Sequence, residues 1–342
     1  GPWADWPAPL RHRRPSAVAE ARRTLAPEGD RQAFRQFLFF DQWHRLREQA
    51  HRRGLQILGD APFYVADDSA DVWAHPGLFE VDEDLRPTVV AGVPPDFFTA
   101  GGQLWGNPLY CWEQHAADGF AWWISRLQAL LQLSDLVRID HFRAFVDFWA
   151  VPAGSPTAAE GRWVPGPGVA FFQRAQEALG GLPSIAEDLG ELHPEVPALL
   201  EEAGRPGMKV MQFAYDGDPA NPFLPAHHTE NCVAYTGTHD NDTTVGWYRS
   251  LNTTQRRRVR AALGSRERGI AWDLMRVAWE SPAFLAVAPL QDVLEVGAEG
   301  RMNTPGSFGG NWSWRCRADA LHQGRRDRLA ALNRATGRLA PG

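Results

Sequence analysis

Three short apolar runs along the chain each end abruptly in acidic residues. They are Asp135–Arg143 (DLVRIDHFR), Pro183–Gly190 (PSIAEDLG) and Val233–Thr244 (VAYTGTHDNDTT). Large apolar and β-branched residues over a few positions, flanked by polar ones, predict short buried strands. We therefore predict a strand at each place, with the polar residues at its carboxyl end.

Other apolar segments predict further strands and the helices between them. The predicted strands are centred near residues 57, 137, 185, 210, 234 and 286, the first spanning Leu55–Tyr64 and the last Ala283–Leu294. The predicted helices are Ser16–Leu25, Gln32–Arg53, Phe120–Leu133, Val169–Leu179, Glu195–Ala203 and Trp272–Trp279. Strands that alternate with helices and carry polar residues at their carboxyl ends are typical of an α/β protein with a parallel barrel of the TIM type.

A closed (β/α)8 barrel has eight strands, whereas six are predicted here. We expect a TIM-type barrel that lacks its first two strands, with a helical segment at 1–54 and the catalytic barrel at 55–342. The stretch at about 65–132 begins with a long segment that has no sustained period and is rich in Asp, Gly, Pro and aromatic residues. A long loop of this kind is functional or forms an inserted subdomain, and both interpretations stay open.

Composition and charge narrow the class of protein. The chain has 342 residues, 44% of them hydrophobic and 22% charged, with a net charge of −6, which suits one large domain or two smaller ones. Basic residues are scattered except at 256–258, so we expect no nucleic-acid partner. The three cysteines are widely spaced without a C-x-x-C motif, which favours a reducing, cytoplasmic location. No apolar run approaches the ~20 residues of a membrane span, so no membrane partner is expected.

The acidic residues at the strand ends suggest catalysis. Arg138 and Asp140 lie two apart, so on a strand their side chains leave the same face, and a neighbouring arginine keeps an aspartate ionised. An Arg-x-Asp by itself is more typical of a structural ion pair. Asp140, Glu187 and Asp240 nevertheless occupy matching positions after three strands, and a buried trio of carboxylates is costly for stability. We therefore expect the three to converge on one functional pocket.

The aromatic content is high, with 15 Trp and 18 Phe against 5 Tyr. Trp73, Trp105 and Trp112 fall in Gly-, Pro- and Asp-rich segments outside the predicted helices and strands. Exposed aromatic rings in loops suit stacking against sugars, while burial beneath the loops explains each of them equally well.

Seven stretches of the sequence closely resemble the amylomaltases, the 4-α-glucanotransferases of glycoside hydrolase family 77 in the α-amylase clan. They are GDAPFYVADDSADVWAHP, VVAGVPPDFFTAGGQLWGNPLY, LVRIDHFRAF, IAEDLG, PGMKVMQFA, YTGTHDNDTT and RMNTPGSFGGNWSWR. Together they run over nearly the whole chain. Members of this family begin with a further region that holds the first two barrel strands, and this chain starts after it.

The resemblance implies a retaining double displacement on α-1,4-glucans, without a cofactor. Asp140 would be the nucleophile, Glu187 the general acid and base, and Asp240 the residue that stabilises the transition state. The implied partners are maltooligosaccharides and glucans derived from starch or glycogen.

The resemblance also implies substrate-binding or supporting roles for further residues. Arg138 would orient the nucleophile, His239 would bind the sugar in the reacting subsite, and Asp60 would support the site from a strand end. Trp105, with Phe97 and Phe98, falls in the loop that covers the sugar chain and helps exclude water in this family.

Elementary chemistry agrees with these residue types. Retaining cleavage requires one carboxylate to attack and a second, protonated carboxyl to donate, about 5–5.5 Å apart. We expect like-charge repulsion from Asp188, Asp140 and Asp240 to raise the pKa of Glu187. Aromatic loops that bind an acceptor and exclude water favour transfer over hydrolysis.

Two other functions remain open at this point. In a metal-dependent barrel hydrolase, His141, His239, Asp240 and Asp242 would be the ligands, although neither H-x-H nor H-E-x-x-H occurs. The other is a non-catalytic or weakly active carbohydrate-binding fragment of a glucanotransferase. We expect no bound metal.

Overall fold

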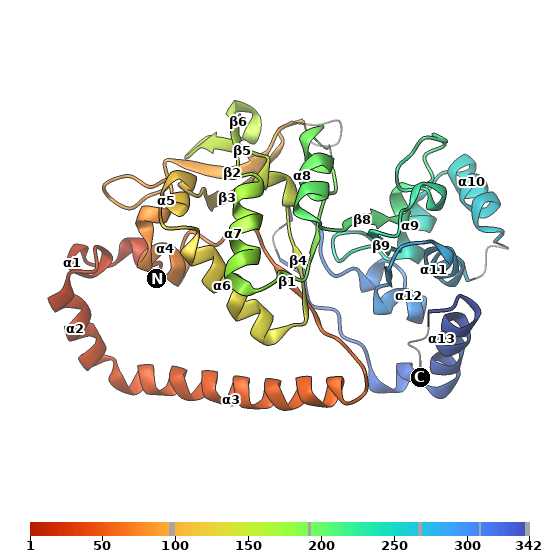
Figure 1. Ribbon diagram of the computed structural model, residues 1–342, viewed down its shortest axis with the longest axis horizontal. Helices are drawn as coiled ribbons and strands as arrows, with labels where there is room; N and C mark the ends of the chain where they lie inside the picture. Colours follow the sequence, from red (N-terminus) through yellow and green to blue (C-terminus); the bar gives the residue numbers. More distant parts are fainter. Residues whose placement is uncertain (96–99, 191–192, 266–268, 308, 339–342) are drawn as a thin grey trace. The chain divides into compact units, whose positions relative to one another are not determined.

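The computed structural model describes the whole chain except residues 96–99, 191–192, 266–268, 308 and 339–342 (Figure 1). The chain divides into two compact units, residues 1–205 and residues 206–342. Both units combine parallel strands with helices, so the protein has an α/β fold. None of the helices in the described part of the chain has the length and apolar character that crossing a bilayer requires.

The first unit contains a parallel sheet in the order β1-β4-β7, formed by Leu58–Ala61, Leu136–Ile139 and Ser184–Ala186. The predicted strands near 57, 137 and 185 are therefore confirmed. Helices α6 (Ala121–Leu133), α7 (Val169–Leu179) and α8 (Glu195–Ala203) lie between or after these strands, and α6 packs on β1 (Figure 1). Gly180 ends α7 in the left-handed conformation, φ +67°, as the glycine pair after Leu179 predicts.

A four-stranded antiparallel sheet in the same unit was not predicted. Its order is β3-β2-β5-β6, from Gln103–Pro108, Val89–Val93, Asp147–Pro152 and Arg162–Pro165. The sequence indicates irregular loops here because the strands are short and the β2–β3 pairing is irregular between Val90 and Gly92. Both features remove the alternation of polar and apolar residues by which a strand is recognised.

Aromatic side chains fill the core of the first unit. The largest fully buried ones are Trp123, Phe63, Phe142, Phe145, Phe171 and Phe172. Trp112 begins helix α5 (Trp112–Ala117), with its ring 6.0 Å from that of Phe63, and Trp73 in α4 (Ala70–Ala74) donates its indole N–H to the Leu10 carbonyl. Trp73 and Trp112 are thus packing residues in helices, and Trp105 lies in β3, so the expectation that the three fall outside helices and strands is wrong. Of the three, Trp105 keeps an exposed ring.

The N-terminal region is helical as predicted, with α1 (Ala8–Arg11), α2 (Pro15–Thr24) and the long α3 (Ala26–His51). Helix α3, all of it within the described residues, buries none of its side chains, and Phe34 and Phe37 are 60% and 63% exposed. Its carboxyl-terminal part is held through Arg47, which pairs with Asp135 just before β4. Burial opposes ionisation of Asp135, but hydrogen bonds from Ile57, Arg47 and His51 lower its pKa to about 2.

The second unit contains a parallel sheet in the order β10-β9-β8, formed by Leu285–Val287, Cys232–Tyr235 and Gly207–Val210. Around it are α9 (Thr244–Ser250), α10 (Thr253–Leu263), α11 (Ile270–Glu280), α12 (Leu290–Leu294) and α13 (Gln323–Ala335). The predicted strands near 210, 234 and 286 are confirmed. The predicted extent of the last one is wrong, because Pro289 ends the extended segment and caps α12.

Candidate active site

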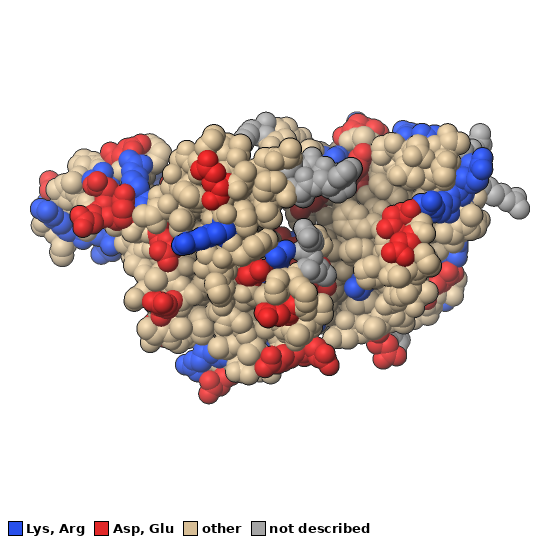
Figure 2. Space-filling view, turned by 90° about the horizontal axis from the view of Figure 1, so that it is seen from above, with Lys and Arg blue, Asp and Glu red and all other residues tan. Residues whose placement is uncertain are grey.

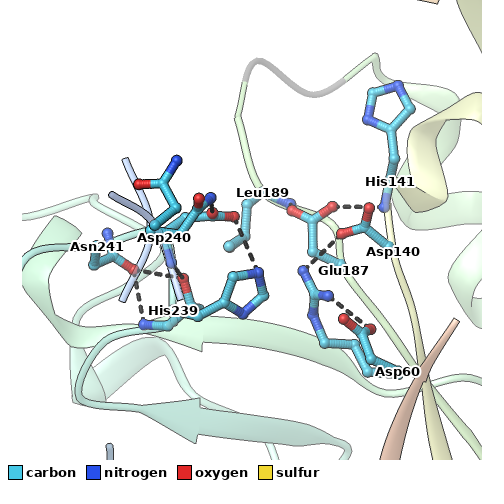
Figure 3. A network of polar contacts seen from close by, with 12 residues as sticks. Asp60, Asp140, His141, Glu187, Leu189, His239, Asp240 and Asn241 are labelled. Carbon is cyan, nitrogen blue, oxygen red and sulfur yellow. Dashed lines mark hydrogen bonds and ion pairs between the residues drawn. The ribbon is translucent and has the colours of Figure 1, made fainter. Parts of the chain in front are cut away.

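Three predicted site residues come together on the parallel sheet of the first unit. Asp60 in β1 lies in register with Arg138 in β4, and Asp140 follows β4. Arg138 donates from Nη1 to Asp60 Oδ1 and from Nη2 to Asp140 Oδ1, each at 2.8 Å (Figure 3). The Arg-x-Asp pattern therefore forms the ion pair that its spacing predicts, with Asp60 as a second carboxylate.

Arg138 is the fixed positive charge of this group. Its side chain is only 9% exposed, and burial alone would lower its pKa. The carboxylates of Asp140, Asp60 and Glu187 outweigh burial and raise the pKa, so the guanidinium remains charged. The contact from Arg138 holds the Asp140 carboxylate in one orientation. Asp140 is 38% exposed, so its other oxygen stays available for chemistry.

Glu187 takes the position beside Asp140 on the neighbouring strand. Ile139 in β4 is in register with Ala186 in β7, so Asp140 and Glu187 are the next residues of both strands and leave the same face. The Glu187 N–H donates to the Ile139 carbonyl at 2.9 Å. Because adjacent strands run ~4.8 Å apart, this arrangement suits the carboxyl separation of about 5–5.5 Å that retaining glycosidases use.

The Glu187 carboxyl is held by two backbone amides. Its Oε2 accepts from the His141 N–H at 2.8 Å and its Oε1 from the Leu189 N–H at 3.1 Å (Figure 3). Burial, followed by the negative charge of Asp140, raises the pKa of Glu187 to about 8, although Arg138 and the two amides oppose the shift. The predicted direction is correct, but burial and not repulsion is the larger cause. At neutral pH Glu187 can therefore hold the proton that a general acid donates.

His141 stands beside this pair in a left-handed backbone conformation, φ +47°. Its ring packs edge-on against Trp105, with centroids 5.0 Å apart, and lies 6.2 Å from the ring of Tyr64. Burial and the nearby Arg143 lower the pKa of His141 to about 4, so its ring is neutral at neutral pH. Trp105 is 37% exposed. The predicted binding residues Phe97 and Phe98 lie outside the described residues.

Asp240 and His239 lie in the second unit, in the loop between β9 and α9. Asp240 Oδ1 accepts from Asn303 Nδ2 at 2.6 Å, and its carbonyl accepts from Arg301 at 2.7 Å. His239 Nε2 lies 3.5 Å from Asp240 Oδ2 (Figure 3). The contacts from Asn303 and Arg301 were not predicted, although both residues lie in RMNTPG, one of the stretches that resemble the family.

An exposed aromatic ring accompanies His239. The Trp312 ring lies 5.1 Å from the His239 ring, is 54% exposed, and belongs to a residue with φ +59°. Its backbone N–H donates to the Met302 carbonyl at 2.7 Å. A bulky residue with positive φ is unusual because this backbone conformation is strained. Tertiary contacts must offset the strain that holds the Trp312 ring in this exposed position.

The ligand set of the alternative metalloenzyme is not assembled in the described residues. Within them no group of three or more His, Cys, Asp or Glu side chains is arranged to hold a metal ion. Asp242 instead accepts from the Thr243 N–H at 2.7 Å, and the His141 ring is enclosed by aromatic side chains.

Comparisons with known proteins identify the family of the chain. A family model described as 4-alpha-glucanotransferase matches residues 1–321. The chain is 50% identical to a 4-alpha-glucanotransferase of Thermus thermophilus and 48% identical to one of Synechocystis, over 99% and 98% of its own length and 69% and 67% of theirs. The structure of an amylomaltase from Streptococcus agalactiae in complex with acarbose matches with a TM-score of 0.97 at 37% identity, over 99% of this chain and 69% of that one. This chain therefore belongs to the 4-alpha-glucanotransferase family.

Proposed function

We propose that Asp140, Glu187 and Asp240 transfer α-1,4-glucan segments by a retaining double displacement. The observation that supports this proposal is the pair of acids at the ends of β4 and β7. Asp140 is held by the charged Arg138, and beside it lies Glu187, whose pKa is raised to about 8. One group is prepared to attack and the other to donate a proton, which is the division of roles that this reaction needs.

In the first step Asp140 attacks the anomeric carbon and forms an ester bond to it as the glycosidic C–O bond breaks. Glu187 gives its proton to the departing oxygen, so the part of the donor on the reducing-end side leaves with a free 4-hydroxyl. Glu187, now a carboxylate, then takes a proton from the 4-hydroxyl of an acceptor sugar. That oxygen attacks the ester-linked carbon, which frees Asp140 and restores the protonated Glu187.

Asp240 and His239 act on the reacting sugar. Asp240 is 41% exposed and presents a carboxylate that stabilises the positive charge developing at the anomeric centre. Arg138 orients Asp140, Asp60 supports Arg138, and His239 hydrogen-bonds sugar hydroxyls. Trp105 covers the sugar chain, so a sugar hydroxyl competes better than water for the ester intermediate.

The substrates we propose are maltooligosaccharides and glucans derived from starch or glycogen. Support comes from the names of the relatives and from the acarbose bound to the Streptococcus agalactiae amylomaltase. We propose no nucleic-acid or membrane partner, and on the face that Figure 2 shows, acidic and basic side chains are interspersed.

We further propose that the six parallel strands belong to a (β/α)8-type barrel, with 1–54 as a helical segment, 55–342 as the catalytic part and an insertion at about 65–132. The sheet orders β1-β4-β7 and β10-β9-β8 support this architecture. We also propose a cytoplasmic location, supported by the three cysteines, which form no disulfide in the described part of the chain.

Incubation of the intact protein with maltotriose, followed by separation of the products, tests the proposal. We expect glucose together with maltooligosaccharides longer than maltotriose. Glucose and maltose alone would indicate a hydrolase, and binding without products would favour the carbohydrate-binding alternative. A chelator is expected to leave the rate unchanged. Loss of activity with the chelator, and its recovery when zinc or manganese is added, would contradict the proposed mechanism.

A further inference from the structure

We infer that Gln291 and Asp292, two adjacent buried residues of α12, are positioning residues for Asp240. Asp292 holds the loop at 236–244 that carries Asp240, and Gln291 holds the segment at 300–303 that donates hydrogen bonds to Asp240. The inference rests on the proposed role of Asp240 in the reaction.

Asp292 joins the two ends of the loop that carries His239 and Asp240. Its Oδ2 accepts from Thr236 Oγ1 at 2.6 Å, and from Thr244 Oγ1 at 2.8 Å. Its Oδ1 accepts from the Thr244 N–H at 3.0 Å. Thr236 directly follows β9 and Thr244 begins α9. A single carboxylate, 1% exposed, therefore fixes both points between which the loop is strung.

Gln291 holds the second segment, the one that contacts Asp240 directly. The Gln291 side chain is buried and donates from Nε2 to the Gly300 carbonyl at 2.9 Å. The next residue is Arg301, which donates to the Asp240 carbonyl, and two further on is Asn303, which donates to the Asp240 carboxylate. Asn303 also donates its backbone N–H to the His239 carbonyl at 3.1 Å. Neighbouring side chains of one short helix thus reach both segments that meet at Asp240.

A purely structural role explains this arrangement poorly. A loop can be held by neutral groups at a lower desolvation cost than that of a buried carboxylate. Asp240, by contrast, is 41% exposed, so packing does not set the direction of its carboxyl group. A misplacement of about 1 Å at a catalytic group costs about 10²-fold in rate, which makes a rigid support for this loop valuable.

The test is a set of kinetic measurements on the intact protein with maltotriose. Asp292→Asn replaces one carboxylate oxygen by an NH2 group, so the side chain can no longer accept from all three of its donors, and it is expected to lower kcat by about 10- to 100-fold while KM changes by less than about threefold. Thr236→Val, which removes one partner of the carboxylate, is expected to lower kcat by about fivefold, and Thr236→Ser, which keeps the hydroxyl, should restore it. The Thr236 pair keeps the test valid if Asp292→Asn fails to fold.

Asn221→Ala provides a matched control for stability. Asn221 is buried to a similar degree, donates to the Phe213 carbonyl and accepts from the Phe223 N–H, each at 2.8 Å. Within the described residues, none of its hydrogen bonds reaches the loop that carries Asp240 or the segment at 300–303. We expect this variant to unfold at lower denaturant concentration with kcat within about twofold of wild type. Equal kcat losses in Asn221→Ala and Asp292→Asn would show that general destabilisation explains both.

A double variant separates this inference from the proposed function. In the Asp240→Asn background, measured with excess enzyme, Asp292→Asn should change the residual rate by less than about twofold, because its effect passes through Asp240. The same loss in both backgrounds, or wild-type kcat in folded Asp292→Asn and Thr236→Val, would overturn the positioning role. A fully active Asp240→Asn would overturn instead the proposed role of Asp240.

Discussion

The carboxylates of the two units are held in different ways. Asp140 and Glu187 directly follow β4 and β7, so the register of a parallel sheet sets their positions. Asp240 lies within the loop between β9 and α9 and depends on side chains from elsewhere, such as Asn303. Sheet register places an acid at a strand end and a neighbouring group then orients it, whereas an acid in a loop is both placed and oriented by groups from other segments.

The two supports also differ in charge. Asp140 is contacted by the guanidinium of Arg138 at 2.8 Å, which is charged and nearly buried. Asp240 is contacted by the neutral amide of Asn303 at 2.6 Å. A buried charge interacts more strongly than an amide, so loss of the first support should affect the reaction more than loss of the second.

The largest effects are expected from the strand-end acids themselves. Asp140→Asn should lower kcat by about 10⁴-fold or more, and Glu187→Gln by about 10²- to 10⁴-fold, because each amide keeps the shape but removes the nucleophile or the proton. Circular dichroism should show an intact fold in both. With a donor whose leaving group needs no proton, such as a glycosyl fluoride, a glycosyl-enzyme detectable by mass spectrometry is expected to accumulate in Glu187→Gln. Either variant retaining more than about a tenth of the wild-type rate would contradict the assignment.

Arg138→Lys tests whether the charged support must also bridge. An ammonium group keeps the charge but does not donate in the fixed fork that joins Asp60 to Asp140, so we expect kcat to fall by about 10²-fold. Asp60→Asn, which removes only the outer carboxylate, should have a smaller effect. The test is measurement of kcat and KM for both variants. A kcat of Arg138→Lys within about threefold of wild type would show that only the positive charge is required.

The raised pKa of Glu187 predicts how activity depends on pH. The protonated form is needed to cleave the donor, so kcat/KM should fall about tenfold per pH unit above pH 8. A rate profile between pH 5 and pH 10 measures this limb. A limb near pH 5 instead would show that Glu187 is ionised at neutral pH.

The same group links pH to stability. The folded protein keeps a proton on Glu187 that the unfolded chain releases above about pH 4.3, so the free energy of unfolding should decrease as pH rises from there to 8. Glu187→Gln removes this loss, so its free energy of unfolding relative to wild type should be greater at pH 7 than at pH 4 by on the order of 3 kcal/mol. Urea unfolding at the two pH values is the measurement.

Asn303→Ala probes the neutral support of the loop acid. Loss of one hydrogen bond to Asp240 should lower kcat by about tenfold, less than Arg138→Lys does. Asn303→Asp, which places a second negative charge against Asp240, should lower it further. If Asn303→Ala had the larger effect of the two supports, the contrast between strand-end and loop acids would be wrong.

The smallest effect is expected at the exposed aromatic ring of the first unit. Trp105→Ala should increase the share of donor lost to water by about threefold, measured as the ratio of hydrolysis to transfer products. Trp163→Ala is a suitable control, since Trp163 has a similar exposure of 39% and lies on the same antiparallel sheet, but its ring packs against that of Trp149 and not against His141. An equal change in both variants would remove Trp105 from the proposed loop function.

Several elements show how far the sequence could be interpreted. The segments around β4, β7 and β9 are predictable because apolar runs this short, between polar residues, indicate buried strands and not helices. The antiparallel sheet was missed because its strands are short and irregular. Helix α12 was missed because its residues continue an apolar segment, and Pro289 was not taken as the point where a helix begins. For α3 the helical period was correct, but a period does not reveal whether the apolar side is covered.

The sequence by itself determined the order of the six parallel strands, the pairing of Arg138 with Asp140, and the family, because these depend on neighbouring residues and on motifs within one stretch. Only the tertiary structure decided that burial is the main cause of the raised pKa of Glu187. It alone showed that Asn303 contacts Asp240 and that Asp292 joins Thr236 to Thr244. Such contacts join residues about 50 to 60 positions apart, and desolvation depends on everything packed around a group, so neither is contained in any local pattern of the chain.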